Sequence, residues 1–366
     1  MKIGVLTSSR ADYSQYLPLM KLIKSTSGFE LKLLVFGTHL SEKFGYTYKD
    51  ILKDGFEIDY RVETESEGDG PEKVNEVICK TISGFSKIWS REKFDLIFAL
   101  GDRYEMFAAC SSALPFNIRL AHIHGGEKTE GAIDDAYRHS ITHMAQIHFA
   151  STEKYRNRVS ELKESDEHVY NVGALSIDNL THLNLFTKEE FLERFNIDLN
   201  LLSILITFHP ETKSYQRNVF YAEELTAALA ELSRYQLIIT MPNADTSGNS
   251  IREELNRFIS RNKNAVGVES FGTIGYLTCM KYCELMLGNT SSGFLESSFF
   301  PKKVINLGSR QNGRILTPNI ISSDITRGAI LKAVTEAEQM TLGGNISIYG
   351  KGDTANKIVE ILKTIQ

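Results

Sequence analysis

The sequence predicts an α/β protein built from two Rossmann-like, doubly wound domains, and three observations support this fold class. Short apolar runs rich in β-branched residues alternate with longer segments of helical spacing in both halves of the chain. Continuous apolar strands separated by helices indicate a parallel sheet that is covered on both faces. The length of 366 residues also exceeds a single typical domain of about 150 residues.

The first domain is expected to comprise residues 1–175. Its apolar runs predict strands, and the periodic segments between them predict helices. The expected strands are Ile3–Thr7, Leu31–Phe36, Phe94–Leu100, Ile118–Ile123 and Ile147–Ala150. The expected helices are Ser14–Ser25, Pro71–Ser90 and Tyr104–Leu114.

The second domain is expected over residues 176–353, beginning in a polar stretch that has no clear strand. Its expected strands are Leu202–Phe208, Leu237–Met241, Ala265–Val268, Glu284–Leu287 and Val304–Leu307. Its expected helices are Val219–Arg234, Ile251–Ser260, Ile274–Lys281 and Asp324–Glu338. The last segment, Thr354–Ile365, predicts a helix that crosses back, so residues 354–366 are assigned to the first domain.

Composition and charge exclude several function classes. The chain has 41 Lys and Arg against 46 Asp and Glu, a formal net charge of −5, so no positive excess exists to neutralise a nucleic-acid backbone. It contains no apolar stretch of about 18 residues that could span a bilayer, and its first residues lack the apolar region of a signal peptide. We expect a cytoplasmic protein without nucleic-acid or membrane partners.

Candidate site residues are those that follow the expected strands, because ligands of open parallel sheets bind beyond the carboxyl ends of the strands. After the first strand, Arg10 opens a helix, and an arginine at a helix N-terminus can bind phosphate. The alternative is a surface charge at Arg10 and a helix cap at Asp12. The chain contains neither G-x-G-x-x-G nor G-x-x-x-x-G-K-[ST], so a dinucleotide fingerprint and a P-loop are both absent.

Acidic and imidazole side chains follow the later strands of the first half. Asp102 comes directly after the strand that ends at Leu100, and Gly101 permits close approach of the backbone. Asp134 opens an expected helix, where helix capping is the alternative to a chemical role. Several histidine and cysteine pairs have spacings that two metal ligands could share, but none has a third ligand or a Glu in H-E-x-x-H, so no metal site is expected. These pairs are His122 with His124, His139 with His143, and Cys279 with Cys283.

The second half contains a turn rich in Gly, Ser and Thr between Leu287 and Glu296. Such a turn, placed between a strand and a helix, offers backbone N–H groups and hydroxyls to a phosphate. An ordinary Ser/Thr cap would give the same pattern. Glu296 is placed to accept hydrogen bonds from a ribose diol, and Arg310 and Arg314 follow the next strand at the same edge.

Seven of these segments together resemble one family. They match, in order, the motifs of the hydrolysing UDP-N-acetylglucosamine 2-epimerases of bacterial sialic acid and legionaminic acid biosynthesis. The resemblance implies two Rossmann-like domains as in glycosyltransferase-B enzymes, with the site in the interdomain cleft and the nucleotide held mainly by the second domain. It also implies no cofactor, no metal, and a homodimer or homotetramer. The segments are 9–13, 101–103, 122–127, 134–139, 208–210, 289–296 and 306–314.

The resemblance implies a two-stage reaction on a UDP-sugar. UDP is eliminated from C1 with loss of the C2 proton, and the resulting 2-acetamidoglucal is hydrated to the 2-epimeric free sugar. Transferred residue by residue, the catalytic positions are Asp102, His124, Glu127, Asp134 and His209. The nucleotide- and substrate-binding positions are Arg10, Asn243, Thr290, Ser291, Ser292, Gly293, Glu296, Arg310 and Arg314.

One position departs from the family pattern. The first glutamate of the E-G-G-E segment of the animal bifunctional enzymes is His124 here. An imidazole can also carry out acid–base chemistry, so the base that takes the C2 proton stays open among Asp102, His124 and Glu127. With residues 38–45, this histidine is similar to bacterial members, some of which use a UDP-linked 2,4-diacetamido-trideoxy sugar.

The expected substrate is UDP-N-acetylglucosamine, which would yield N-acetylmannosamine and UDP, and the diacetamido sugar is the alternative. A non-hydrolysing epimerase and a glycosyltransferase of the same architecture are further alternatives. A non-catalytic UDP-sugar sensor belongs to a different class, and it would need no carboxylates such as Asp102 and Asp134 at a reacting centre.

Overall fold

The computed structural model describes the chain except for residues 67, 69, 212, 243–247, 345 and 366. The chain folds into two units, which are treated separately below. Unit 1 consists of Met1–Glu127, Asp134–Thr181 and Tyr349–Gln366, and unit 2 of Lys128–Ile133 and His182–Ile348. The chain therefore passes from one unit to the other after residues 127, 133, 181 and 348.

The short segment 128–133, which the sequence placed in the first domain, packs with unit 2. The Glu130 N–H donates to the Asn312 carbonyl at 2.9 Å, and the Lys213 ammonium donates to the Glu130 carbonyl. Gly131 lies so close to the Ser309 carbonyl that a Cβ would be 2.2 Å from its oxygen. Backbone contacts of this kind require a glycine.

Within the described residues, unit 1 contains a parallel sheet of seven strands in the order β3-β2-β1-β4-β5-β6-β7. The predicted doubly wound architecture is confirmed, because each strand pairs in parallel and helices connect them. The strands are β1 (Lys2–Thr7), β2 (Glu30–Phe36), β3 (Tyr60–Val62), β4 (Leu96–Leu100), β5 (Leu120–Ile123), β6 (Ile147–Ala150) and β7 (Val169–Asn171).

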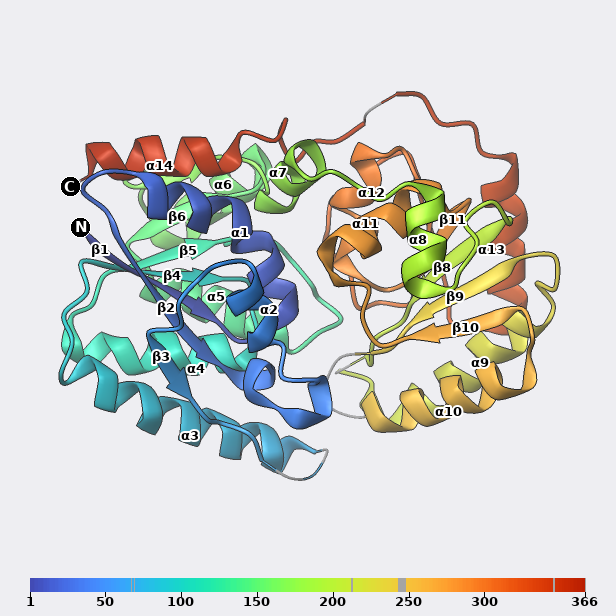
Figure 1. Ribbon diagram of the computed structural model, residues 1–366, viewed down its shortest axis with the longest axis horizontal. Helices are drawn as coiled ribbons and strands as arrows, with labels where there is room; N and C mark the ends of the chain where they lie inside the picture. Colours follow the sequence, from blue (N-terminus) through green and yellow to red (C-terminus); the bar gives the residue numbers. More distant parts are fainter. Residues whose placement is uncertain (67, 69, 212, 243–247, 345, 366) are drawn as a thin grey trace. The chain divides into compact units, whose positions relative to one another are not determined.

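Helices cover both faces of this sheet (Figure 1). Alternate residues of β4 face opposite ways, since Phe98 packs with residues of α1 and α14, and Ile97 with residues of α3 and α4. The helices of unit 1 are α1 (Arg10–Ser25), α2 (Tyr48–Lys53), α3 (Pro71–Trp89), α4 (Tyr104–Ala113), α5 (Asp134–Met144), α6 (Glu153–Lys163), α7 (Leu175–His182, which ends one residue into unit 2) and α14 (Thr354–Thr364). Short 3₁₀ turns lie at η1 (Gly37–Leu40), η2 (Glu42–Phe44) and η3 (Leu114–Phe116).

Helix α14 lies along α1 in unit 1 (Figure 1). Its apolar face, which includes Ile358 and Leu362, belongs to the same core as Ile3 and Phe98. The buried Asp178 carboxylate holds the beginning of the helix, because it accepts the N–H groups of Thr354 at 3.0 Å and Ala355 at 2.7 Å. A carboxylate at a helix N-terminus satisfies free N–H groups and complements the helix dipole.

Helix α1 begins at Arg10, four residues earlier than the pattern predicts, because Ser9 is its N-cap. Pro18 lies inside this helix and leaves the Ser14 carbonyl without its usual donor, since proline has no N–H. The Asn179 side chain supplies the missing hydrogen bond to the Ser14 carbonyl at 2.7 Å. The helix therefore continues through the proline.

Unit 2 contains, within its described residues, a parallel sheet of six strands in the order β10-β9-β8-β11-β12-β13. Numbered from its own first strand, this is the Rossmann order 3-2-1-4-5-6. The strands are β8 (Ser203–Thr207), β9 (Gln236–Thr240), β10 (Ala265–Val268), β11 (Leu285–Gly288), β12 (Lys303–Leu307) and β13 (Ile320–Ser323). The helices are α8 (Lys188–Phe195), α9 (Asn218–Ala230), α10 (Gly248–Arg261), α11 (Gly272–Tyr282), α12 (Glu296–Phe299) and α13 (Arg327–Gln339), with 3₁₀ turns η4 (Tyr215–Arg217) and η5 (Ser291–Gly293).

Candidate functional site

Each unit has a switch point, where the order of strands in the sheet reverses direction. In unit 1, β1 pairs with both β2 and β4, and in unit 2, β8 pairs with both β9 and β11. Ligands of open α/β sheets bind beyond the carboxyl ends of the strands at this point. The residues that follow β1, β4 and β5 are therefore the candidate ligand-binding residues of unit 1, and those that follow β8, β11 and β12 are the candidate ligand-binding residues of unit 2.

The turn after β1 is organised by the buried Asp12. Its carboxylate accepts hydrogen bonds from Thr7 Oγ1 at 2.5 Å and from the N–H and hydroxyl of Ser8 at 3.0 and 2.8 Å. His39 extends this hydrogen-bond network, since its Nε2 lies 3.0 Å from Thr7 Oγ1. Burial lowers the pKa of the His39 imidazole. These hydrogen bonds fix the conformation of the turn after β1. The turn leads directly into α1, whose first residue is Arg10.

The carboxyl ends of β4 and β5 bring two sequence-predicted carboxylates to one buried arginine. Arg138 of α5 forms ion pairs with Asp102 and, at 3.5 Å, with Glu127, and it donates to the His124 carbonyl at 3.0 Å. Sequence reasoning did not select Arg138. The sequence pattern that could have identified Arg138 is its position four residues after Asp134 on an expected helix, because this spacing places the two residues on the same helix face.

His124 and Glu127 interact directly. His124 Nδ1 lies 2.6 Å from Glu127 Oε1, and the Ser151 hydroxyl donates to the same oxygen at 2.7 Å. Asp134 is the first residue of α5, and residues 128–133 separate it from Glu127. The structure therefore groups Asp102, His124 and Glu127 around Arg138, and Ser151 is a member that the sequence did not reveal.

His122 has a structural place in unit 1. Its Nε2 donates to the Gly101 carbonyl at 2.8 Å, and the Thr142 hydroxyl lies 3.1 Å from Nδ1. His148 is its neighbour on β6. Burial lowers the pKa of His122 to about 4 and that of His148 to about 3. Both imidazoles are therefore neutral at physiological pH.

These two histidines predict a loss of stability in acid. In the unfolded chain a histidine titrates near pH 6.5, about two units or more above these folded values. The unfolded state then binds more protons below pH 6.5, so the free energy of unfolding should fall as the pH drops toward 4. His148→Leu should reduce this slope by up to about 1.4 kcal/mol per pH unit. Urea denaturation at several pH values between 7 and 4.5 measures the slope, and equal slopes in the parent and His148→Leu would contradict the assignment.

In unit 2, Asn289 fixes the backbone of His209. Its side-chain oxygen accepts the His209 N–H at 2.7 Å, and its amide donates to the His209 carbonyl at 2.8 Å. The ends of β8 and β11 are drawn together beside it, because a Cβ on Gly288 would lie 1.9 Å from the Thr207 oxygen. His209 is therefore held at the switch point of this unit.

The predicted phosphate-binding turn follows β11 as a short 3₁₀ turn and helix. Thr290 is the N-cap of η5, and its hydroxyl lies 3.2 Å from Ser292 Oγ. The Tyr276 hydroxyl lies 2.6 Å from Ser292 Oγ, and burial raises the pKa of Tyr276 to about 12. Glu296 then begins α12.

The loop after β12 is built around Glu211, a residue that sequence reasoning did not select. The Glu211 carboxylate accepts the Ser309 N–H at 2.8 Å, the Ser309 hydroxyl at 2.6 Å and the Arg310 N–H at 3.0 Å. Arg314 Nε donates to the Gln311 side chain at 2.6 Å, and Gln311 donates to the Asn289 carbonyl at 2.8 Å. The predicted Arg310 donates to the Asn289 carbonyl at 3.4 Å, and the predicted Arg314 is connected to the same carbonyl through Gln311. The predicted Asn243 lies outside the described residues.

Other features of the described residues bear on function class. None of their His, Cys, Asp and Glu side chains form a group of three or more that could hold a metal ion. Cys279 and Cys283 are buried, and burial raises the pKa of the Cys283 thiol to about 11. None of the helices in the described part of the chain is long and apolar enough to cross a membrane.

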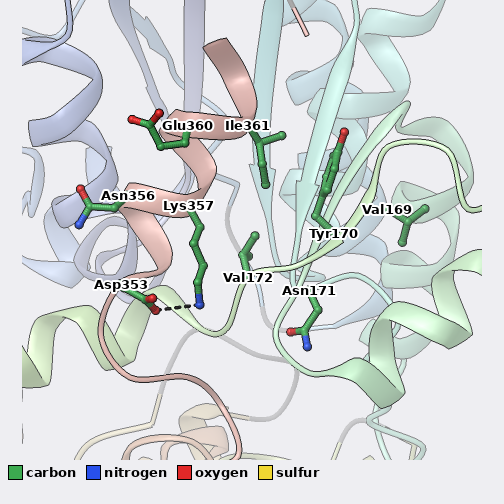
Figure 2. Close-up of a pocket in the computed structure, with 9 residues that line it drawn as sticks. All are labelled: Val169, Tyr170, Asn171, Val172, Asp353, Asn356, Lys357, Glu360 and Ile361. Atoms are coloured by element: carbon green, nitrogen blue, oxygen red, sulfur yellow. Dashed lines mark ion pairs between the residues drawn. The ribbon is translucent and has the colours of Figure 1, made fainter. Parts of the chain in front are cut away.

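A pocket of about 540 Å³ lies elsewhere in unit 1, between the end of β7 and helix α14. Side chains of the β7 segment line one side of it and those of α14 the other, and an ion pair between Asp353 and Lys357 lies at its edge (Figure 2). None of the sequence-predicted site residues line this pocket. The lining residues are Val169, Tyr170, Asn171, Val172, Asp353, Asn356, Lys357, Glu360 and Ile361.

Comparison with known proteins identifies the family. Residues 21–363 match the family described as UDP-N-acetylglucosamine 2-epimerase. The chain belongs to this family. It is similar to the GDP/UDP-N,N'-diacetylbacillosamine 2-epimerase (hydrolyzing) of Campylobacter jejuni, with 35% identity over 88% of this chain and 84% of the relative. It is also similar to the UDP-N,N'-diacetylbacillosamine 2-epimerase (hydrolyzing) of Legionella pneumophila, with 31% identity over 100% and 96% of the two chains.

A solved structure of the same family has the same fold. The UDP-GlcNAc 2-epimerase of Neisseria meningitidis, in a structure bound to UDP-GlcNAc, superposes with a TM-score of 0.83 and 17% identity, and each chain is covered completely. The resemblance seen in the sequence motifs is thus confirmed at the level of family, and the doubly wound fold is confirmed at the level of architecture.

Proposed function

We propose that this protein is a hydrolysing 2-epimerase of UDP-linked 2-acetamido sugars. The observation that carries the proposal is the grouping of Asp102, Glu127 and His124 around Arg138 at the carboxyl ends of β4 and β5. This reaction needs groups that remove and return protons at C2 and at the departing oxygen. A sensor of UDP-sugars would need no such cluster, whereas membership of the epimerase family supports catalysis.

The reaction balances in two stages. In the first, a base takes the C2 proton, the C1–O bond breaks with its electron pair on the oxygen of UDP, and a C1=C2 double bond forms. In the second, water supplies a hydroxyl to C1 and a proton is delivered to C2. We propose that Asp102 and Asp134 take part in the acid–base chemistry in unit 1, with the base that takes the C2 proton left open here among Asp102, His124 and Glu127.

We propose that unit 2 holds UDP through Thr290, Ser291, Ser292, Gly293 and the two arginines of the β12 loop. His209 is the group that protonates the departing phosphate, since a neutral imidazole and its conjugate acid interconvert near physiological pH. Glu296 accepts the ribose hydroxyls. Arg10 at the beginning of α1 and Asn243 complete the proposed set of ligand contacts.

The two relatives favour the diacetamido substrate over UDP-N-acetylglucosamine, the first expectation from the sequence. Both are hydrolysing 2-epimerases of N,N'-diacetylbacillosamine nucleotides, a 2,4-diacetamido sugar. We therefore propose UDP-N,N'-diacetylbacillosamine as the preferred substrate and UDP-N-acetylglucosamine as the second candidate. One of the two relatives is named for both GDP- and UDP-linked sugars. The test of substrate preference therefore has to compare both nucleotides.

The mechanism predicts a specific isotope pattern. When either UDP-sugar is turned over in deuterium oxide, the free sugar should carry one deuterium at C2, because the C2 proton is lost and replaced from solvent. In water labelled with heavy oxygen, the label should enter the sugar and not UDP, because C1–O is the bond that breaks. NMR and mass spectrometry of the products with both sugars, and with the GDP-linked sugar, measure this pattern and the preference. Retention of UDP on the sugar would indicate a non-hydrolysing epimerase, and product without C2 deuterium would exclude elimination.

A further inference from the structure

The backbone of His124 is held in an uncommon conformation. Its φ is +66°, in the left-handed region that residues other than glycine adopt rarely. Its N–H still donates to the Phe149 carbonyl at 3.1 Å, so the residue stays attached to β6, and its carbonyl accepts from Arg138. Such backbone strain persists where the surrounding structure enforces it, and it concentrates at functional sites.

The two ring nitrogens of His124 have different surroundings. Nδ1 lies 2.6 Å from Glu127 Oε1, whereas Nε2 is buried and has no hydrogen-bond partner among the residues that the structure describes. The whole side chain is only 5% exposed. A buried polar atom without a partner is uncommon in folded proteins and calls for an explanation, such as a catalytic role.

The hydrogen bond to Glu127 determines which nitrogen carries the proton. An ionised carboxylate can only accept, so the neutral imidazole places its hydrogen on Nδ1 and its lone pair on Nε2. Glu127 is itself held, because Ser151 donates to Oε1 at 2.7 Å and Arg138 lies 3.5 Å from Oε2. These partners compensate the cost of burying a charged carboxylate.

We propose that Glu127, supported by Ser151 and Arg138, positions His124 so that its Nε2 is the base that removes the C2 proton. This proposal rests on the proposed epimerase function and chooses among the three bases that the sequence left open. The proton moves from C2 to Nε2 as the C1–O bond breaks, and the imidazolium that forms is stabilised by the adjacent Glu127 carboxylate. Within this group of four, His124 is the catalytic residue, and Glu127, Ser151 and Arg138 are positioning residues; Asp102 and Asp134 remain candidates for the group that returns a proton to C2.

Inversion at C2 limits His124 to one stage. A proton returned to the face from which it was taken would restore the original configuration, so a different group has to deliver the proton during hydration. Removal of His124 should therefore block elimination and spare hydration. This separation distinguishes a base from a residue that only supports the fold of the site.

The test compares the two stages in variants of the whole protein. His124→Asn suits the left-handed backbone, which asparagine tolerates, and it should slow UDP release by about 100-fold or more, the usual contribution of a general base. Hydration of added 2-acetamidoglucal in the presence of UDP should stay within about threefold of the parent. His143→Ala, at an exposed position on α5, is the matched control. Equal losses in both stages, or no loss in either, would overturn the assignment.

The positioning residues are tested separately. Glu127→Gln should slow elimination by about tenfold or more with UDP affinity unchanged, and Ser151→Ala should have a smaller effect that Ser151→Thr restores. Nitrogen-15 NMR of histidine-labelled parent protein should show His124 protonated on Nδ1 alone, and protonation on Nε2 would contradict the proposal without any assay of activity. If the parent releases UDP from neither sugar, the proposed function fails. If the parent turns over normally and His124→Asn matches it, only the present inference fails.

Discussion

Asp102→Asn is expected to reduce the turnover of UDP-sugar by about 100-fold or more, because acid–base groups contribute about 10² to 10⁴ in rate. Asp102 follows β4 and Gly101, and its carboxylate pairs with Arg138. Its side chain is 21% exposed, in contrast to 2% for Glu127, so it is the more accessible of the two carboxylates on Arg138. Asparagine keeps the shape but cannot exchange a proton near neutral pH.

The affinity for UDP should change less than about threefold in Asp102→Asn, since the proposed nucleotide contacts lie in unit 2 and at Arg10. Rates of UDP release and calorimetric binding of UDP give the two quantities. Asp95→Asn is a matched control near the opposite end of the same strand, where the Asp95 carboxylate accepts the Lys2 N–H at 2.6 Å. A parent-like rate in Asp102→Asn would remove Asp102 from the mechanism.

Gly288→Ala is expected to destabilise unit 2 by about 3 kcal/mol or more, at the upper end of the range for overpacked sites. Gly288 has a φ of +147°, and an added Cβ would lie 1.9 Å from the Thr207 oxygen and 2.6 Å from its carbonyl carbon. Both contacts are with backbone, so no side-chain rotation can relieve them. The pairing of β8 with β11, where Gly288 is opposite Thr207, would have to open.

Denaturation by urea, followed by circular dichroism, measures this loss. Gly328→Ala is the control, because Gly328 lies in the first turn of α13 and a Cβ there meets nothing within 4 Å. The control should be at least as stable as the parent, since alanine favours the helix by about 1 kcal/mol over glycine. Equal stability of Gly288→Ala and the parent would show that the strand ends can separate without cost.

The central strands were predictable because they are continuous apolar runs, and β6 matches its expected range completely. One short edge strand, β10, was also predicted with its full range, Ala265–Val268. Three strands were missed: β3, β7 and β13. All of them lie at edges of the two sheets and have only three or four residues. An edge strand is packed and paired less fully than a central one, so its sequence need not form an apolar run.

The candidate site also contains some residues that the sequence pattern could predict and others that it could not. Asp102 and His209 could be selected as candidates because they follow strands, where the rule for ligand binding at the carboxyl ends of strands applies. Arg138, Ser151 and Glu211 were not found, because they act through hydrogen bonds to residues 11 or more positions away. The spacing of residues in the sequence does not predict such contacts, because only the folded backbone brings the partners together.

The return of the C-terminal helix to unit 1 affects the order in which the protein can fold during synthesis. The ribosome makes all of His182–Ile348 before the residues of α14 emerge. Ile358 and Leu362 belong to the core that α1 shares with the first sheet, so unit 1 cannot complete this core until the chain is almost finished. Unit 2, whose residues are all made earlier, has no such delay, although it comes second in the sequence. A chain that stops before Thr354 leaves the apolar face of α1 without its partner.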